Sequence, residues 1–300
     1  MNDLLQDLLQ NRLECYVNHK SKPQRFFVEE IERKNLAEQN RKAEIVKVNG
    51  KGKILDVFEE EDVEKVRYQL LMRYVIKQKG QIFIEESIED RLAEVFRSTI
   101  VDDYLLQPEG VTEDETIEVF NQNDMDLYPF NNDAEERISY QYDRRKAVRY
   151  AETWWNSYNP KYKKFENDCT NFISQCLHEG GGPMRGYPNR GKGWWMRNSN
   201  WSYSWSVAHS LRLYLGNSTI GVRARQVSSP EELLLGDVIC YDFEGDGRYN
   251  HNTIVTAKDA NGMPLVNAHT YNSRARYWAY EDSTAYTPNI KYKFFTIVDG

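Results

Sequence analysis

The sequence predicts an α+β protein in which a small module of helices and strands precedes a second module built on a helix and an antiparallel sheet. Apolar residues recur at helical spacing in several segments, and alternating segments rich in β-branched residues lie between them. Turn-forming pairs, such as Lys79-Gly80, separate neighbouring strands. A chain of 300 residues is long enough for two domains of this kind.

The composition is that of a globular protein, with 40% hydrophobic and 28% charged residues. No window approaches the ~20 apolar residues that a membrane helix needs. The first twenty residues have neither a basic stretch nor a sustained apolar core, so they do not resemble a secretion signal. We therefore expect a cytoplasmic protein that does not span a membrane, with spore or wall association as the alternative.

The charge is distributed unevenly along the chain and indicates separate modules. Residues 141–300 hold 20 Lys and Arg against 15 Asp and Glu, whereas residues 1–140 hold 19 against 31. A polar run containing Pro and Gly occupies much of 106–140, which is typical of a linker. We predict a front module at 1–105, a linker at 106–142 and a back module at 143–300.

The front module is expected to be helical first and then an antiparallel meander. We find no catalytic constellation in it. The expected elements are helices at 2–17 and 23–40, strands at 43–48 and 54–58 around a turn at 49–52, and a hairpin of 66–77 with 81–95.

The back module is expected to alternate helices with strands of one antiparallel sheet. Asp143 is predicted to cap the first helix. The expected elements are helices at 144–155, from 169 onward and at 207–215, then strands at 249–257 and 265–269 around a turn at 259–262.

Cys169 is the candidate nucleophile because it falls in the first turn of a helix whose apolar face carries Phe172, Ile173 and Cys176. Asp168 is the expected N-cap residue. The positive end of the helix dipole is expected to lower the pKa of the Cys169 thiol. Backbone N–H groups at this terminus could also hold an oxyanion.

The remaining cysteines are expected to be reduced. Cys15, Cys176 and Cys240 form neither a CxxC pair nor a zinc spacing, and Cys176 fits the core. No metal or other cofactor is predicted.

Two histidines are candidates for the base that a nucleophilic thiol requires. A hairpin centred between Ala260 and Asn261 pairs residues whose numbers sum to about 521, which places His251 opposite His269 or Thr270. Directly opposed side chains lie about 5 Å apart. His251 is then the candidate base and His269 the group that orients it. The other histidines of the back module, His178 and His209, are expected to be structural.

All seven tryptophans lie between Trp154 and Trp278, which favours an aromatic site as much as an aromatic core. A glycine-rich loop at 179–195 and the serine-rich segment that follows are interpreted as an exposed substrate wall, with packing on the core as the alternative. The candidate wall residues are Trp194, Trp195, Trp201 and Trp205. The acidic segment 242–247 is predicted to be a turn and not a calcium loop, because Thr253 occupies the last ligand position.

Three motifs resemble those of NlpC-like cell-wall peptidases: Asp168-Cys169-Thr170, Leu235-Gly236-Asp237-Val238-Ile239 and His251-Asn252-Thr253-Ile254-Val255. His269 falls where that papain-like superfamily places its third polar residue. Longer stretches, such as NDCTNFISQCL and GDVICYDFEGDGRYNH, are similar to the bacterial putative amidase domain family, a branch of this superfamily. The resemblance covers residues 143–299. Asn252-Thr253 replaces the Val-Gly of NlpC-like proteins.

This resemblance implies a papain-like fold, a Cys-His-His site and amide hydrolysis, plausibly in peptidoglycan stem peptides or a related small peptide. Asp168 is grouped with the tryptophans as a candidate substrate contact. The expected partner is a peptide or peptidoglycan-derived substrate and not a nucleic acid. Two alternatives stay open: an acyltransferase that resolves the same thioester with an amine, and a catalytically silent module that binds glycan or peptide.

Overall fold

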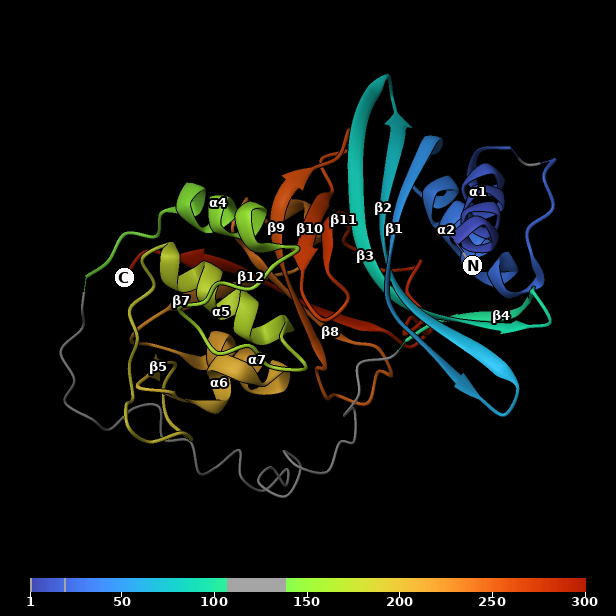
Figure 1. Cartoon of the computed structure of the whole chain (residues 1–300). Coiled ribbons are helices and arrows are strands. Elements are labelled where there is room, and N and C mark those ends of the chain that lie inside the picture. The colour runs from blue at the N-terminus through green and yellow to red at the C-terminus, as the bar shows by residue number, and fades with distance from the viewer. Residues whose placement is uncertain (1, 19, 107–138) are drawn as a thin grey trace. The chain divides into compact units, whose positions relative to one another are not determined.

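The computed structural model describes residues 2–18, 20–106 and 139–300 (Figure 1). They form two compact units. The first unit contains the described part of residues 1–107 together with 259–261 and 271–286. The second unit contains the described part of residues 108–258 together with 262–270 and 287–300. The predicted linker, 106–142, lies largely outside the described residues, and the two predicted boundaries between the modules stay a prediction.

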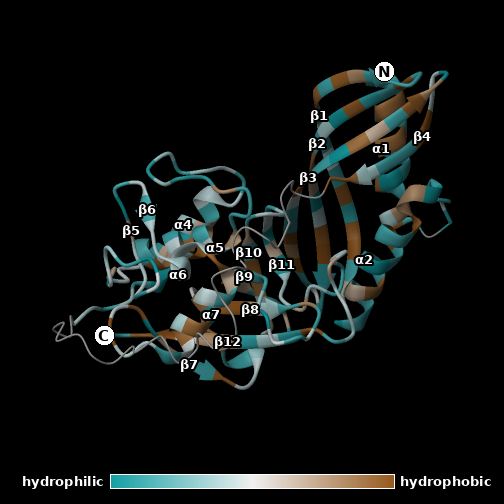
Figure 2. Ribbon diagram, turned by 90° about the horizontal axis from the view of Figure 1, so that it is seen from below, coloured by the Kyte–Doolittle hydropathy of each residue, from teal (hydrophilic) through white to brown (hydrophobic). Residues whose placement is uncertain are grey.

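The first unit contains two long helices and an antiparallel sheet of strand order β1-β2-β3-β11, with β4 also paired to β3. Hydrophobic and hydrophilic residues alternate along β1, β2 and β3 (Figure 2), and the buried ones form a core with apolar residues of the helices. The elements are α1 (Asn2–Val17), η1 (Arg25–Phe27), α2 (Val28–Asn40), β1 (Glu44–Glu60), β2 (Val63–Gln78), β3 (Gln81–Phe96), β4 (Thr99–Leu105) and β11 (Ser273–Tyr277).

The turn expected at 49–52 is wrong, because β1 runs through these residues without interruption. The glycines there make room for helix α1. A β-carbon at Gly50 would lie 3.2 Å from Cδ2 of Leu13, and one at Gly52 would lie 3.2 Å from Cδ1 of Leu9. Both approaches are tight contacts. Close packing of a helix against the strand therefore explains glycines that sequence reasoning assigned to a turn.

The hairpin expected between β2 and β3 is confirmed. Lys79 and Gly80 have φ values of 47° and 80°, and Gln78 pairs with Gln81. Two residues with positive φ give the twist that matches neighbouring antiparallel strands.

The second unit places helices beside an antiparallel sheet of strand order β10-β9-β8-β12-β7 (Figure 1). Its core combines residues of α4, α5 and α7 with β8, β9 and β12. The elements are α4 (Arg144–Trp154), α5 (Cys169–Glu179), β5 (Met196–Arg197), β6 (Asn200–Trp201), α6 (Tyr203–Ser206), α7 (Ala208–Asn217), β7 (Arg223–Val227), η3 (Pro230–Glu232), β8 (Val238–Asp242), β9 (His251–Lys258), β10 (Pro264–Ala268) and β12 (Lys291–Val298).

Most elements expected in the second unit are confirmed, and so is the mixture of helices with antiparallel strands. The Asp143 carboxylate accepts a hydrogen bond of 3.0 Å from the Lys146 N–H and caps α4. The segment 242–247 is a turn, in which the Asp242 carboxylate accepts the N–H groups of Gly245 and Gly247. Among the helices of the described residues, none combines the length and the apolar character needed to cross a membrane.

Candidate active site

Cys169 is the first residue of α5, and only 6% of its surface is exposed. Its backbone N–H donates to Oγ1 of Thr270 at 3.2 Å, and the Asp168 N–H donates to the same oxygen at 3.1 Å. Thr270 follows β10 closely in the chain and has a φ of 81°. The start of α5 is therefore anchored to the end of the β9–β10 hairpin.

Asp168 occupies the expected N-cap position, but its side chain makes no capping hydrogen bond. One carboxylate oxygen accepts the Phe165 N–H at 3.0 Å and the Asn171 side-chain amide at 2.8 Å. The other oxygen lies 2.7 Å from Nδ1 of His269. The buried carboxylate is thus bound within the protein on both oxygens, which orders the loop before the nucleophile.

His269 is buried, and hydrogen bonds occupy both of its ring nitrogens. Nδ1 meets the Asp168 carboxylate, and Nε2 lies 2.8 Å from the Trp154 carbonyl oxygen. A carbonyl oxygen only accepts, so Nε2 carries a proton and donates it to Trp154. Phe172 stacks on the ring at 4.0 Å between centroids. His269 therefore links α4 to the start of α5, and neither ring nitrogen is directed to His251.

The register of the β9–β10 hairpin agrees with the sequence argument. Val266 pairs with Val255 and Asn267 with Ile254, so the numbers of each pair sum to 521. A bulge shifts the register nearer the turn. Correct register was therefore not sufficient to predict which atoms His269 contacts.

His251 is the first residue of β9 and pairs with Tyr241 of β8. Its ring lies 5.6 Å from that of Tyr241 and 6.2 Å from that of Phe243, between centroids. Its neighbour Asn252 donates its side-chain amide to Oγ1 of Thr170 at 3.0 Å. The start of β9 is therefore attached to the first turn of the helix that carries Cys169.

The surroundings of the Cys169 sulfur correct one expectation. Burial raises the pKa of the Cys169 thiol, and this effect outweighs the lowering by hydrogen bonds from the Thr170 side chain and the Asn252 backbone. The expected lowering of this pKa by the helix dipole is therefore wrong for the free protein.

The tryptophan-rich segment is not the exposed wall that the sequence suggested. Trp194, Trp195 and Trp205 are buried, and only Trp201 is partly exposed. The indole of Trp194 donates to Oγ of Ser174 at 2.9 Å, and that of Trp205 donates to Oδ1 of Asn171 at 2.8 Å. Large aromatic side chains whose N–H has a hydrogen-bond partner are stable in the interior. The alternative expectation, that this segment packs on the core, therefore describes these three tryptophans. Substrate contact through these residues stays a prediction.

The other histidines and cysteines of the second unit have structural surroundings. The Tyr249 N–H donates to Nδ1 of His209 at 3.1 Å, and Nδ1 of His178 lies 3.2 Å from the Gly182 carbonyl oxygen. Cys176 and Cys240 are buried in the core of the second unit. Across residues 2–18, 20–106 and 139–300, no cluster of three or more His, Cys, Asp or Glu is arranged to hold a metal ion.

Sequence reasoning did not select the residues that hold the candidate groups in place. Asn171, Thr270 and the Trp154 carbonyl fix Asp168, the helix start and His269. A signal existed for Asn171, a polar residue within a predicted apolar helix. The contacts of Thr270 and Trp154 depend on tertiary packing and have no local signature.

Residues 141–295 match the model of the family described as "Putative amidase domain", and the chain belongs to this family. It is 50% identical over 303 residues to the uncharacterized protein YhbB of Bacillus subtilis strain 168, which covers 99% of this chain and 96% of YhbB. It is also 32% identical over 135 residues to YjcM of the same organism, covering 42% of this chain and 30% of YjcM. No solved structure matches. The family assignment supports an amidase-like hydrolase.

Proposed function

We propose that the second unit is a cysteine amidohydrolase of the papain-like, NlpC-like kind, with Cys169 as nucleophile and His251 as base. One observation carries the proposal. Cys169 lies at the buried start of α5, and the residue directly after His251, Asn252, donates its side-chain amide to Oγ1 of Thr170, the residue directly after Cys169, at 3.0 Å. Nucleophile and base thus come from a helix start and a strand start that the Asn252–Thr170 hydrogen bond joins.

In the proposed reaction, Cys169 Sγ attacks the amide carbonyl carbon while His251 takes the thiol proton. The tetrahedral intermediate collapses, the carbon–nitrogen bond breaks and His251 returns the proton to the leaving amine. Water then hydrolyses the thioester with His251 again as base. Because burial raises the pKa of Cys169, the thiolate forms during the attack and is not present beforehand. The Cys169 N–H, bound to Thr270 in the free protein, would turn to the oxyanion.

His269 and Asp168 are proposed as positioning residues. The two ring nitrogens of His269 are held by Asp168 and Trp154, so the ring is not available to orient His251 directly. It instead fixes Asp168, whose backbone carbonyl accepts the first hydrogen bond of α5, from Phe172 at 2.9 Å. In this role the Asp168 carboxylate binds groups of the protein itself and does not contact the substrate.

The substrate class is proposed as a peptide amide, with peptidoglycan stem peptides as the first candidates. The family supports amide chemistry, and the NlpC-like motifs favour a cell-wall peptide. The test is mass-spectrometric analysis of muropeptides and peptide amides incubated with wild type, Cys169→Ala, His251→Ala and the control His178→Ala. Hydrolysis by wild type and the control alone is expected. Equal cleavage by Cys169→Ala would contradict the proposal, and amide exchange with added amines would favour an acyltransferase.

A further inference from the structure

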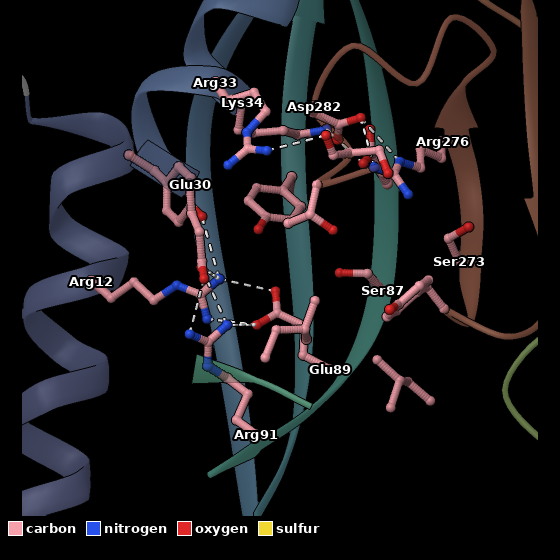
Figure 3. Close-up of a pocket in the computed structure, with 18 residues that line it drawn as sticks. Arg12, Glu30, Arg33, Lys34, Ser87, Glu89, Arg91, Ser273, Arg276 and Asp282 are labelled. Atoms are coloured by element: carbon pink, nitrogen blue, oxygen red, sulfur yellow. Dashed lines mark hydrogen bonds and ion pairs between the residues drawn. The ribbon is translucent and has the colours of Figure 1, made fainter. Parts of the chain in front are cut away.

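The first unit contains a pocket of about 110 Å³ that the proposed reaction does not use. Its walls come from α1, α2, β3 and the segment 271–284 (Figure 3). All of these residues belong to the first unit. A pocket of this size holds a small solute and not a polymer.

One end of the pocket is formed by a buried network of two arginines and two glutamates. Arg12 binds Glu89 through two hydrogen bonds, of 2.7 and 3.0 Å, and binds Glu30 at 3.0 Å. Arg91 binds the same two glutamates at 2.9 and 3.0 Å. Arg91 also binds Asp103 at 2.6 Å, so each charged group at this end has an opposite charge beside it.

The other end is formed by a second ionic group around Lys34. Its ammonium lies 2.6 Å from Glu85 and 3.0 Å from Asp282, and Asp282 also binds Arg276 at 2.8 Å. Figure 3 shows the two ionic groups apart, with the Ser87 side chain pointing into the space between them. Ion pairs buried in this way contribute little net stability compared with apolar packing. Their placement around a pocket therefore favours a binding role.

Three buried polar atoms of lining residues have no hydrogen-bond partner in the part of the chain that is described. They are Nε of Arg12, Oε2 of Glu85 and Oγ of Ser273, in residues that are 2%, 3% and 1% exposed. Leaving such atoms unpaired costs about 1–3 kcal/mol each. Glu85 Oε2 requires a donor, and the Ser273 hydroxyl can donate or accept.

The lining also carries one cation without an acidic partner. Arg33 hydrogen-bonds the Ser283 carbonyl at 3.2 Å, and within the described chain it forms no ion pair. The other four cations of the lining each form ion pairs: Arg12 with Glu30 and Glu89, Arg91 with these two and Asp103, Lys34 with Glu38, Glu85 and Asp282, and Arg276 with Asp282. Arg33 thus offers a positive charge to a ligand, while Glu85 offers an acceptor.

We propose that this pocket binds a small zwitterion, a free amino acid, whose ammonium group is held by Glu85 and whose carboxylate is held by Arg33. The ammonium supplies the donor that Glu85 Oε2 lacks, and the carboxylate gives Arg33 the acidic partner that it lacks. Ser87 and Ser273 lie where they can complete the polar contacts. The site is separate from the proposed hydrolase site and does not depend on its activity.

The test is isothermal titration calorimetry of full-length Cys169→Ala protein with alanine, alanine amide and N-acetylalanine. Alanine should bind, and each analogue should bind at least tenfold more weakly, because one lacks the carboxylate and the other lacks the ammonium. Arg33→Ala and Glu85→Gln should each weaken alanine binding at least tenfold. The matched control is Arg67→Ala, which removes an exposed arginine of β2 outside the pocket lining.

Thermal unfolding without ligand separates lost binding from lost folding in the two pocket variants. Several outcomes overturn the proposal: no heat with alanine, glycine or serine at about 10 mM, equal binding of the three alanine compounds, or unchanged affinity in a folded Arg33→Ala protein. Binding of inorganic phosphate in place of amino acids would also overturn it, since a simple anion would then be the ligand. An inactive hydrolase site would leave all of these results unchanged.

Discussion

Replacing His269 with alanine removes an interaction on which the proposed site geometry depends. The substitution deletes a buried ring with hydrogen bonds of 2.7 Å to Asp168 and 2.8 Å to the Trp154 carbonyl, and it removes the stacking on Phe172. Asp168 keeps only its two neutral donors, from Phe165 and Asn171. Leaving a buried Asp168 oxygen unpaired costs about 1–3 kcal/mol, and the cavity left by the ring adds to this cost.

Urea unfolding of the full-length protein measures this cost, with His178→Ala as the matched histidine control. His178 makes one hydrogen bond, of 3.2 Å to a carbonyl, and edge contacts with the rings of Trp194 and Trp205, so its loss should cost about 1 kcal/mol. His269→Gln should recover part of the loss, because the amide can still donate to Asp168. A loss below about 1 kcal/mol for His269→Ala, with unchanged Cys169 reactivity, would refute the positioning role.

Three further predictions concern charge and packing. Because burial raises the pKa of Cys169, its alkylation rate by iodoacetamide, followed by intact mass, should rise with a midpoint above the free-thiol value of about 8.5; a midpoint near 7 would contradict this. Arg12 and Arg91 lower the pKa of Glu89 to about 2, so its stabilising effect is complete above the unfolded value of about 4.3 and is lost as the pH falls toward 2. Glu89→Gln should therefore flatten the acid side of the stability profile, and a profile as steep as that of wild type would refute the assignment. Gly50→Val should cost about 1–3 kcal/mol in urea unfolding by crowding Leu13, and Leu13→Ala should restore part of it; additive losses would exclude this contact.

Local patterns were sufficient to predict most helices, the hairpins and the candidate nucleophile. Helix α5 could be predicted because Phe172, Ile173 and Cys176 share a face, and the β9–β10 register followed from the turn residues. The turn at Gly50 was predicted wrongly because glycine serves both turns and close packing. Only the position of helix α1 distinguishes these two uses.

The site was harder to predict than the fold because side-chain partners come from distant segments. The ring of His269 was expected to face His251, yet it binds Asp168 and Trp154. Burial of Cys169 depends on the whole second unit, so local sequence predicted the wrong direction for its pKa shift. The burial of Trp194 and Trp205 likewise follows from polar partners on α5, which periodicity cannot reveal.

Acylation by p-nitrophenyl acetate, followed by intact mass and peptide mapping, shows whether Cys169 is a nucleophile activated by His251. We expect a burst of p-nitrophenolate and one acetyl group per chain, located on Cys169. This acylation should be absent in Cys169→Ala, slower by about 10²-fold in His251→Ala and unchanged in His178→Ala. An acetyl group on another residue, or equally fast acylation in His251→Ala, would contradict the assignment of nucleophile and base.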